Sequence, residues 1–270
     1  MTESSTLHVA VLQSSLHWQH AAANRAQFSQ QIAELVQSTA APLDLLVLPE
    51  MFNSGFSMQP ERFAEDANGD TVQWLQAHAK QYQLALAGSI AIRTAQGFVN
   101  RLLFVTPDGT VQHYDKRHLF RMGDEHQHYQ AGHERVIVNY RGWRVLLQIC
   151  YDLRFPVFAR NRNDYDLALY VANWPAPRAR IWSTLLSARA IENQAYVIGC
   201  NRVGADPNGL QYSGDSVVLD FIGAPLASLP AHRAGALCAT LDKQALDEFR
   251  RSFPAHLDSD EFVLQSQARD

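Results

Sequence analysis

An apolar run that ends in a cysteine constrains this chain more than any other feature. The β-branched and leucine residues at 145–149 predict a buried strand, and Cys150 follows directly. Asp152 and Pro156 then predict a turn that leads into a helix. A cysteine at such a turn has its sulfur near unpaired backbone N–H groups, which favour a thiolate and can receive an oxyanion. A cysteine alone is more often a small core residue, so the prediction depends on two further segments.

Two other predicted strands are followed by a residue that carries a charge. The apolar segment 43–48 is followed by Glu50, and the segment 111–115 is followed by Lys116. A glutamate or a lysine alone in a loop is usually a solvated surface residue. Together with Cys150, however, these residues supply a base, a cation and a nucleophile, which is the set of groups that thiol-dependent amide hydrolysis needs.

The chain resembles the nitrilase (carbon–nitrogen hydrolase) superfamily, which uses a Glu-Lys-Cys triad. The resemblance depends on three motifs in the family's order: Leu-Pro-Glu at 48–50, Tyr-Asp-Lys at 114–116 and Cys-Tyr-Asp-Leu-Arg-Phe-Pro at 150–156. Glu125 also lies seven residues before Gly132, where the family has a second glutamate. Within the superfamily, residues 115–120 and 171–175 are most similar to the bacterial omega-amidase branch, which hydrolyses 2-oxoglutaramate.

The resemblance implies a role for each member of the triad. Cys150 attacks the amide and forms a thioester, while Glu50 is the base and Lys116 stabilises the oxyanion together with the backbone N–H of Tyr151. Glu125 is expected to support the site, either by a hydrogen bond to Lys116 or by orienting the substrate. The residues expected to bind substrate are Phe120, Arg154, Asn173 and Trp174.

The substrate that this branch implies is a short dicarboxylic acid monoamide, whose distal carboxylate needs a partner. Arg154 is the first candidate for that partner, with Arg178 and Arg202 as alternatives, and Arg154 has the alternative role of pairing with an internal acid. Phe120, Tyr151 and Trp174 are expected either in the pocket or in the core.

Local patterns predict a mixed α/β fold without an internal domain boundary. Strands are predicted at 7–13, 43–48, 84–91, 98–106, 110–114, 136–140, 143–149, 166–172, 195–200, 215–221, 224–229 and 236–241, and helices at 21–36, 72–82, 178–194 and 243–251. The resemblance adds what the pattern cannot: a four-layer α-β-β-α sandwich, usually dimerised. A single domain is expected at 7–262, with a C-terminal tail at 263–270.

Composition narrows the class of protein further. The chain has 270 residues, 47% of them hydrophobic, and a net charge of −4 without a basic run, so a nucleic-acid partner is not expected. No apolar stretch reaches the roughly 18 residues of a membrane span, and the polar N-terminus does not resemble a signal peptide. Three widely spaced cysteines suggest reduced thiols and a cytoplasmic protein, with Cys200 and Cys238 expected in the core.

Several alternatives remain open at the level of the sequence. The same triad also serves hydrolysis of other small amides, carbamoyl compounds and nitriles. A non-catalytic binding protein with the same fold is a second alternative, and a redox sensor is a third, although no resolving cysteine lies near Cys150 in the sequence. His126 and His128 have spacing that a metal could use on one side of a strand, but no metal or other cofactor is expected, because thiolate chemistry requires none.

Overall fold

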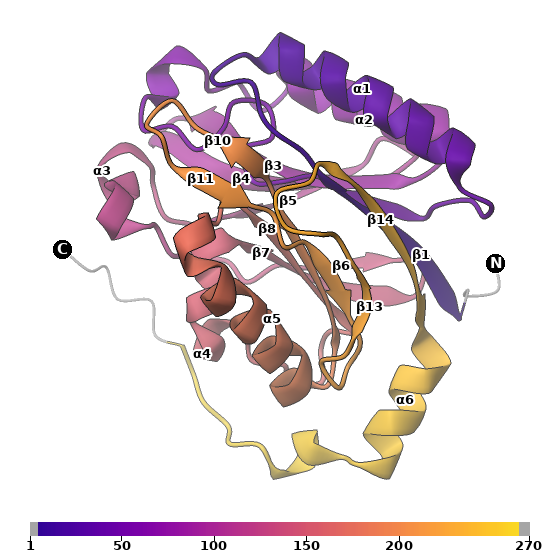
Figure 1. The fold of residues 1–270 in the computed structure, drawn as a ribbon. Helices are drawn as coiled ribbons and strands as arrows, with labels where there is room; N and C mark the ends of the chain where they lie inside the picture. The colour runs from indigo at the N-terminus through magenta and orange to yellow at the C-terminus, as the bar shows by residue number, and fades with distance from the viewer. Residues whose placement is uncertain (1–4, 265–270) are drawn as a thin grey trace.

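Two β-sheets packed face to face form the centre of the molecule. The computed structural model describes residues 5–264, and within this range two six-stranded sheets each carry helices on their outer face. Figure 1 shows α1 and α2 above the first sheet and α4 and α5 below the second. The layers therefore follow the order α-β-β-α, which confirms the predicted four-layer sandwich.

The first sheet combines a parallel centre with antiparallel edges. Its strands, in spatial order, are β14 (Gly235–Asp242), β1 (Thr6–Gln13), β2 (Leu45–Val47), β3 (Ala85–Thr94), β4 (Gly97–Val105) and β5 (Val111–Asp115). The strands β1, β2 and β3 run parallel, whereas β14, β4 and β5 pair antiparallel to their neighbours. The carboxyl ends of the parallel strands consequently meet at one edge of the sheet.

The second sheet repeats this plan. Its strands, in spatial order, are β13 (Pro225–Ser228), β12 (Val217–Leu219), β9 (Tyr196–Asn201), β8 (Leu167–Ala172), β7 (Trp143–Ile149) and β6 (Ile137–Tyr140). Again the three central strands β7, β8 and β9 are parallel. Arg141 and Gly142 join β6 to β7 with φ values of 49° and 79°, as a two-residue type I′ hairpin requires.

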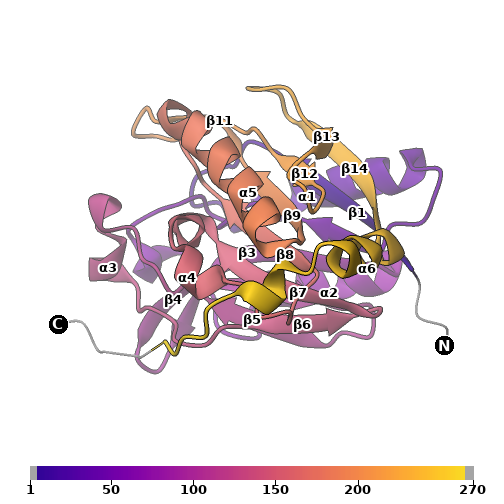
Figure 2. The same cartoon turned by 90° about the horizontal axis from the view of Figure 1, so that it is seen from below.

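The helices within residues 5–264 are α1 (Ala21–Ser38), α2 (Asp70–Tyr82), α3 (Glu125–His128), α4 (Pro156–Ala159), α5 (Ala179–Asn193) and α6 (Lys243–Ser252). Of these, α1, α2 and α5 cover the outer faces of the sheets with apolar residues. Phe28, Ile32 and Leu75 of α1 and α2 pack on the first sheet, and Trp182 and Leu186 of α5 pack on the second. Figure 2, seen from below, shows α5 lying across β8 and β9. The helix α6 meets the C-terminal end of α5, where Arg250 donates to the carbonyl of Gln194 at 2.9 Å.

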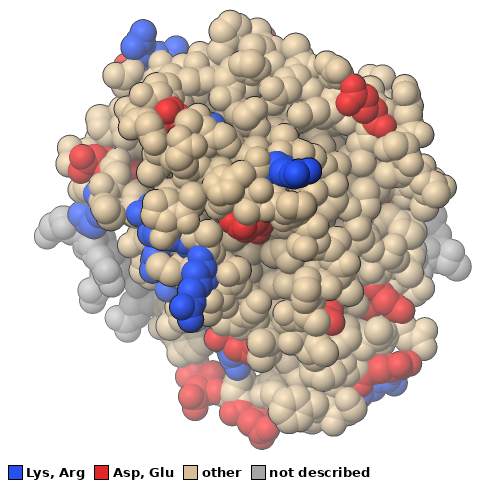
Figure 3. All heavy atoms as spheres, in the orientation of Figure 1, with Lys and Arg blue, Asp and Glu red and all other residues tan. Residues whose placement is uncertain are grey.

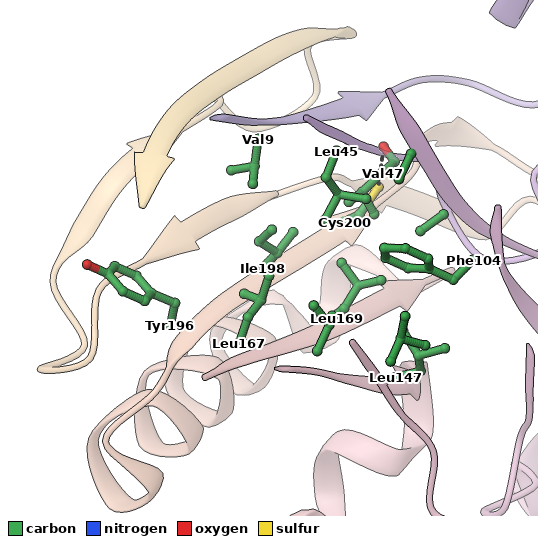
Figure 4. Packing of buried hydrophobic residues seen from close by; sticks show 14 of the residues in the cluster. Val9, Leu45, Val47, Phe104, Leu147, Leu167, Leu169, Tyr196, Ile198 and Cys200 are labelled. Carbon is green, nitrogen blue, oxygen red and sulfur yellow. Dashed lines mark hydrogen bonds between the residues drawn. The ribbon is translucent and has the colours of Figure 1, made fainter. Parts of the chain in front are cut away.

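The largest apolar cluster fills the space between the two sheets. Figure 4 shows Val9, Val47 and Phe104 of the first sheet facing Leu169 and Ile198 of the second. All five side chains are buried. Burial of one such side chain contributes about 1.5–3 kcal/mol, so this layer holds the two sheets in fixed register with one another. That rigidity allows residues from both sheets to form one site.

Three features differ from the sequence-based expectations. Cys200 is buried in the central core as predicted, but Cys238 is exposed, because β14 is an edge strand and places this side chain on its outer face. The turn after Cys150 is a 3₁₀ helix, Cys150–Arg154, followed by only one turn of α4. A further hairpin, β10 (Val203–Ala205) and β11 (Gln211–Ser213), was not predicted. Most of the expected tail, residues 265–270, lies outside the described residues.

Charged side chains of both signs occur on the surface. Figure 3 shows them scattered over this face among uncharged residues, with one small basic group at its left. Within residues 5–264, no helix is long and apolar enough to cross a membrane.

A buried carboxylate ties α6 to the second sheet. Asp166, just before β8, accepts from Arg144 at 2.7 Å and from Arg250 of α6 at 3.0 Å, and it lies 2.8 Å from the ammonium of Lys243. Burial opposes ionisation of Asp166, but hydrogen bonds from Arg144 and Lys243 outweigh it and lower its pKa to about 2. This cluster fixes the C-terminal helix against the end of the sheet.

We expect Asp166→Asn to lower the free energy of unfolding at neutral pH by about 3 kcal/mol, because three cations lose the charge that they surround. Since the pKa of Asp166 is depressed in the folded protein, its stabilisation is complete above roughly pH 4 and is lost as the pH falls through about 2. Urea unfolding at neutral pH and at several acidic pH values should therefore show the two proteins converging in acid. A stability difference that grows in acid would contradict this assignment.

Candidate active site

The ends of strands from both sheets converge on one point. Cys150 follows β7 and Asn173 follows β8 in the second sheet, while Glu50 follows β2 and Lys116 follows β5 in the first. The strands β7 and β8 are parallel neighbours, and β2 and β5 also run in the same direction, because β4 pairs antiparallel with both β3 and β5. The ends of these strands therefore lie at one edge of each sheet, which explains why residues so distant in sequence meet here. The structure thus brings the three residues of the predicted triad together.

Lys116 is the centre of a buried charge cluster. Its Nζ donates to Glu50 Oε1 at 2.8 Å and to both oxygens of Glu125 at 3.0 and 2.9 Å. All three side chains are fully buried. Glu125 also accepts from the backbone N–H of Phe120 at 2.7 Å. The sequence left two roles open for Glu125, a hydrogen bond to Lys116 or orientation of the substrate. The structure shows the hydrogen bond to Lys116.

Gly132 explains the fixed spacing between Glu125 and a glycine. Its N–H donates to the backbone carbonyl of Lys116 at 2.9 Å. A Cβ added at this position would lie 2.1 Å from the backbone oxygen of Asp115, which is too close for any side chain. The glycine lets the chain after α3 pack directly on the segment that carries Lys116.

Two asparagines fix the carboxylate of Glu50. Asn100 of β4 donates from Nδ2 to Glu50 Oε1 at 2.8 Å, and the backbone N–H of Asn173 donates to Oε2 at 2.7 Å. The Asn173 side chain in addition donates to the backbone carbonyl of Glu50 at 2.6 Å. Glu50 therefore has one orientation, with both oxygens held by donors.

The backbone at Cys150 is strained and is held by Asp152. The φ angle of Cys150 is 46°, in the left-handed region that residues other than glycine rarely adopt. Asp152 is fully buried and accepts from the N–H of Ile149 at 2.9 Å and from the hydroxyl of Tyr114 at 2.8 Å. It also accepts from the N–H of His118 at 3.0 Å. One carboxylate thus joins the turn that carries Cys150 to the segment that carries Lys116.

Burial and the local charges set the protonation of the cluster. Burial raises the pKa of the Cys150 thiol, and the negative charge of Glu50 raises it further, while the Lys116 ammonium acts in the opposite direction. Burial opposes the charged form of Lys116, but Glu125 and Glu50 outweigh it and raise the pKa of this ammonium. Burial raises the pKa of Glu125. The resting site accordingly holds a neutral thiol beside a lysine that keeps its charge.

A pocket of about 330 Å³ opens above Cys150 and Lys116. This size suits a small molecule rather than a polymer. Its lining includes the predicted residues Phe120, Tyr151, Arg154, Asn173 and Trp174, together with Phe56, Met58, Met122, Gly123, Pro175, Arg178, Asp206, Asn208, Leu210 and Tyr212. Glu50 and Glu125 do not line the pocket. Both carboxylates lie behind Lys116 and Cys150, which do line it.

Two of the three arginine candidates face the pocket. The guanidinium of Arg154 lies 5.3 Å from the ring centre of Trp174, and that of Arg178 lies 5.4 Å from the ring centre of Phe120. In the described part of the chain, neither makes an ion pair, so the alternative that Arg154 pairs with an internal acid is wrong. Arg202 is also wrong as a candidate, because it is buried behind the pocket and donates to the backbone carbonyls of Val203 and Ala205.

The sequence-based interpretation missed several contributors to the site. Asn100 and Arg101 are two polar residues inside the otherwise apolar strand β4, and that interruption is a signal that pattern analysis could have used. The clamp made by Asp152, Tyr114 and His118 and the hairpin β10–β11 at the pocket carry no comparable signal. His126 and His128 lie in the short helix α3 rather than on a strand, and among residues 5–264 no group of metal-ligating side chains is found.

This fold and site define a hydrolase of carbon–nitrogen bonds. The chain belongs to the carbon–nitrogen hydrolase family, whose model matches residues 8–251. The resemblance to the nitrilase superfamily is thereby confirmed.

Individual proteins of the family that are similar to this chain include two amidases and one solved structure. The chain is 54% identical to Omega-amidase YafV of Escherichia coli (strain K12) over 96% of this chain and 98% of that protein. It is 34% identical to 2-oxoglutaramate amidase of Bacillus subtilis over 81% of this chain and 86% of that protein. Among solved structures, XC1258 of Xanthomonas campestris, a CN-hydrolase superfamily protein with an arsenic adduct in its active site, superposes with a TM-score of 0.91 at 47% identity, covering 96% of this chain and 99% of that one.

Proposed function

We propose that the protein is an omega-amidase, which hydrolyses the terminal amide of short dicarboxylic acid monoamides such as 2-oxoglutaramate to the acid and ammonia. The main observation behind the proposal is a pocket lined by Cys150 and Lys116, with two guanidinium groups in its wall that make no ion pair within residues 5–264. Near full-length similarity to an omega-amidase, and similarity to a 2-oxoglutaramate amidase over 81% of this chain, support the substrate.

In the first step, Cys150 attacks the carbonyl carbon of the amide. Because the resting thiol is neutral, Glu50 takes its proton as the carbon–sulfur bond forms. The oxyanion of the tetrahedral intermediate is stabilised by the Lys116 ammonium and the backbone N–H of Tyr151. Glu50 then passes the proton to the nitrogen, the carbon–nitrogen bond breaks, and ammonia leaves an acyl-thioester on Cys150.

In the second step, Glu50 takes a proton from water, and the resulting hydroxide attacks the thioester. The same two donors stabilise the second oxyanion, and the proton held by Glu50 returns to the sulfur as the acid leaves. Glu125 acts through Lys116, since its two oxygens fix the ammonium 2.8 Å from Glu50. No metal or cofactor enters either step.

The distal carboxylate of the substrate is bound by Arg154 and Arg178. Both guanidinium groups line the pocket, and each stacks on an aromatic ring, which limits its freedom before binding. A carboxylate left unpaired in such a pocket would lose its hydration without compensation. Phe120 and Trp174 contact the short chain between the two ends of the substrate, and Asn173 lines the pocket beside Glu50.

The test of this function is ammonia release from a panel of small compounds. The expected order of kcat/KM is 2-oxoglutaramate first, succinamate next, and glutamine, asparagine and a simple nitrile far behind. The distal methyl ester of succinamate is expected to lose roughly 30-fold or more, because it cannot pair with a guanidinium. Preference for the nitrile, or equal rates for succinamate and its ester, would rule out this specificity. Absence of ammonia release from every amide would favour a binding protein.

Two substitutions locate the carboxylate site. Arg154→Met and Arg178→Met are each expected to raise KM for succinamate while leaving the value for its methyl ester nearly unchanged. Arg180→Met, an exposed arginine of α5 outside the pocket lining, is the matched control and is expected to leave both values unchanged. Equal losses for acid and ester in the Arg154 and Arg178 variants would mean that these residues only shape the pocket.

We also propose a domain organisation, a cellular location and an oligomeric state for the enzyme. Residues 7–262 form one carbon–nitrogen hydrolase domain of a cytoplasmic protein whose partner is a small amide, without nucleic acid or membrane. A homodimer is supported by the exposed apolar side chains Val157, Ile181 and Ile191 on the helices α4 and α5. Sedimentation equilibrium is expected to give twice the chain mass of 30.3 kDa.

A further inference from the structure

Asn100 closes a ring of hydrogen bonds beneath the pocket. Its Nδ2 donates to Glu50 Oε1 at 2.8 Å and to Glu125 Oε1 at 3.3 Å. The Nζ of Lys116 donates to the same two oxygens at 2.8 and 3.0 Å. Two nitrogens and two carboxylate oxygens therefore alternate around the ring. The backbone carbonyl of Asn100 also accepts from the N–H of Lys116 at 2.9 Å, which fixes both donors to one another.

The ring holds two carboxylates that would otherwise repel each other. Glu50 and Glu125 are both fully buried and share one ammonium. Two like charges in a buried site bind a proton unless donors compensate them. An amide supplies two N–H groups without adding charge, so Asn100 stabilises the ionised pair. The other titratable groups that face this pair are Lys116, Cys150, Tyr129 and Tyr212.

The side-chain oxygen of Asn100 accepts no hydrogen bond from the described residues. Among residues 5–264, Asn100 Oδ1 is buried and has no hydrogen-bond partner. An orphaned acceptor of this kind destabilises the fold. A leucine of similar size would remove the orphan, but it would also remove the hydrogen bonds to Glu50 and Glu125. The presence of asparagine at this position therefore indicates that its donors serve the two carboxylates.

We infer that Asn100 is a positioning residue that keeps Glu50 and Glu125 ionised together, so that Glu50 is free to accept the proton of Cys150. Asn100 does not line the pocket and acts on the substrate only through Glu50 and Lys116. The inference rests on the role proposed above for Glu50 as the base. In this role Asn100, a residue outside the triad, lowers the pH above which Glu50 is ionised and can act as the base.

The first test measures protonation without any substrate. Infrared difference titration follows the carbonyl stretch of buried carboxylic acids as the pH changes. Adding Glu125→Gln to the natural protein and to each variant identifies the band that belongs to Glu50 and Glu125. Asn100→Leu removes the hydrogen bonds to both carboxylates and is expected to raise the titration midpoint by at least about one to two pH units, the effect of losing a single hydrogen bond to a charged group. Asn193→Leu, the same substitution at a buried asparagine of α5 outside the site, is expected to leave the midpoint unchanged. An unchanged midpoint in Asn100→Leu, or an equal shift in the control, would overturn the inference.

The second test follows turnover of the best amide as a function of pH. In Asn100→Leu the acidic limb of kcat/KM is expected to move upward by the same amount as the infrared midpoint, with KM unchanged at the plateau. A raised KM with an unmoved limb would show that Asn100 only shapes the pocket. If Asn100→Leu does not fold, the infrared titration is repeated with Asn100→Ser, which keeps one donor. A titration midpoint above that of the natural protein supports the inference, and an equal midpoint contradicts it.

The two proposals fail in different ways. If no amide in the panel is hydrolysed but the infrared midpoint moves, the proposed function is wrong and the effect of Asn100 on the two carboxylates stands. If the amide is hydrolysed but neither the midpoint nor the acidic limb moves, the role of Asn100 is wrong and the omega-amidase function stands.

Discussion

Cys150→Ala is expected to abolish turnover, with a loss of about a millionfold, the scale at which hydrolases lose activity when the nucleophile is removed. The reason is chemical, because Cys150 is the only thiol among the described residues that line the pocket, and a thioester needs a thiol. Alanine at this position keeps the same strained backbone, whose φ is 46°, and Asp152 still holds the turn. The free energy of unfolding should therefore change little, and circular dichroism with urea titration checks that the variant is folded.

The other two cysteines are matched controls for this variant. Cys200→Ala leaves a small cavity between the sheets, where its Sγ lies 3.7 Å from the carbonyl of Val47, and should lower stability by about 1 kcal/mol. Cys238→Ala changes an exposed edge-strand residue and should be nearly neutral. Both are expected to keep near-native kcat. Loss of turnover in the Cys200 variant alone, with Cys150→Ala active, would overturn the assignment of the nucleophile.

Glu50→Gln and Lys116→Met should each reduce kcat by two to four orders of magnitude. Glutamine keeps the shape of Glu50 but cannot accept the proton of the thiol, and a missing general base reduces the rate by about 10²–10⁴-fold. Methionine removes one of the two oxyanion donors, which reduces the rate by about 10²–10³-fold. Lys116→Met also leaves Glu50 and Glu125 without their cation, so its stability must be measured beside its rate.

Two ion-paired residues outside the site, a lysine and a glutamate, provide the controls for these two variants. Lys243→Met removes a lysine from the Asp166 cluster, and Glu192→Gln removes the partner of Arg189 on α5. Both changes lie outside the pocket lining and are expected to alter stability without altering kcat. Near-native rates in Glu50→Gln or in Lys116→Met would show that the charge cluster is structural and that another base activates Cys150.

The sequence predicts most of this fold because the relevant signals are local. Alternating and continuous apolar runs mark the strands, and Gly109 and Gly142 mark two of the turns that join them. The triad is predictable for a similar reason, since Glu50, Lys116 and Cys150 each stand just beyond an apolar strand. The local pattern alone does not predict that two sheets stack, and the family resemblance supplies that.

Contacts between distant segments explain what the sequence could not predict. Cys238 sits in an apolar strand, but only the sheet order shows that this strand is an edge. Arg202 lies in a segment as apolar as the pocket strands, and its burial behind the pocket follows from the β10–β11 hairpin, whose short strands carry little periodicity. Asn100 and Asp152 matter because of partners 50 and 38 residues away, which no local pattern encodes.

A covalent acyl group on Cys150 would be direct evidence of the proposed thioester. Enzyme that is turning over 2-oxoglutaramate is quenched in acid, which preserves thioesters, and its peptides are analysed by mass spectrometry. The account predicts that the peptide containing Cys150 carries the acyl group of the substrate and that hydroxylamine removes it. It also predicts that Cys150→Ala carries none. Hydrolysis of the amide with no acyl group on Cys150, or with the group on Cys200 or Cys238, would contradict the account.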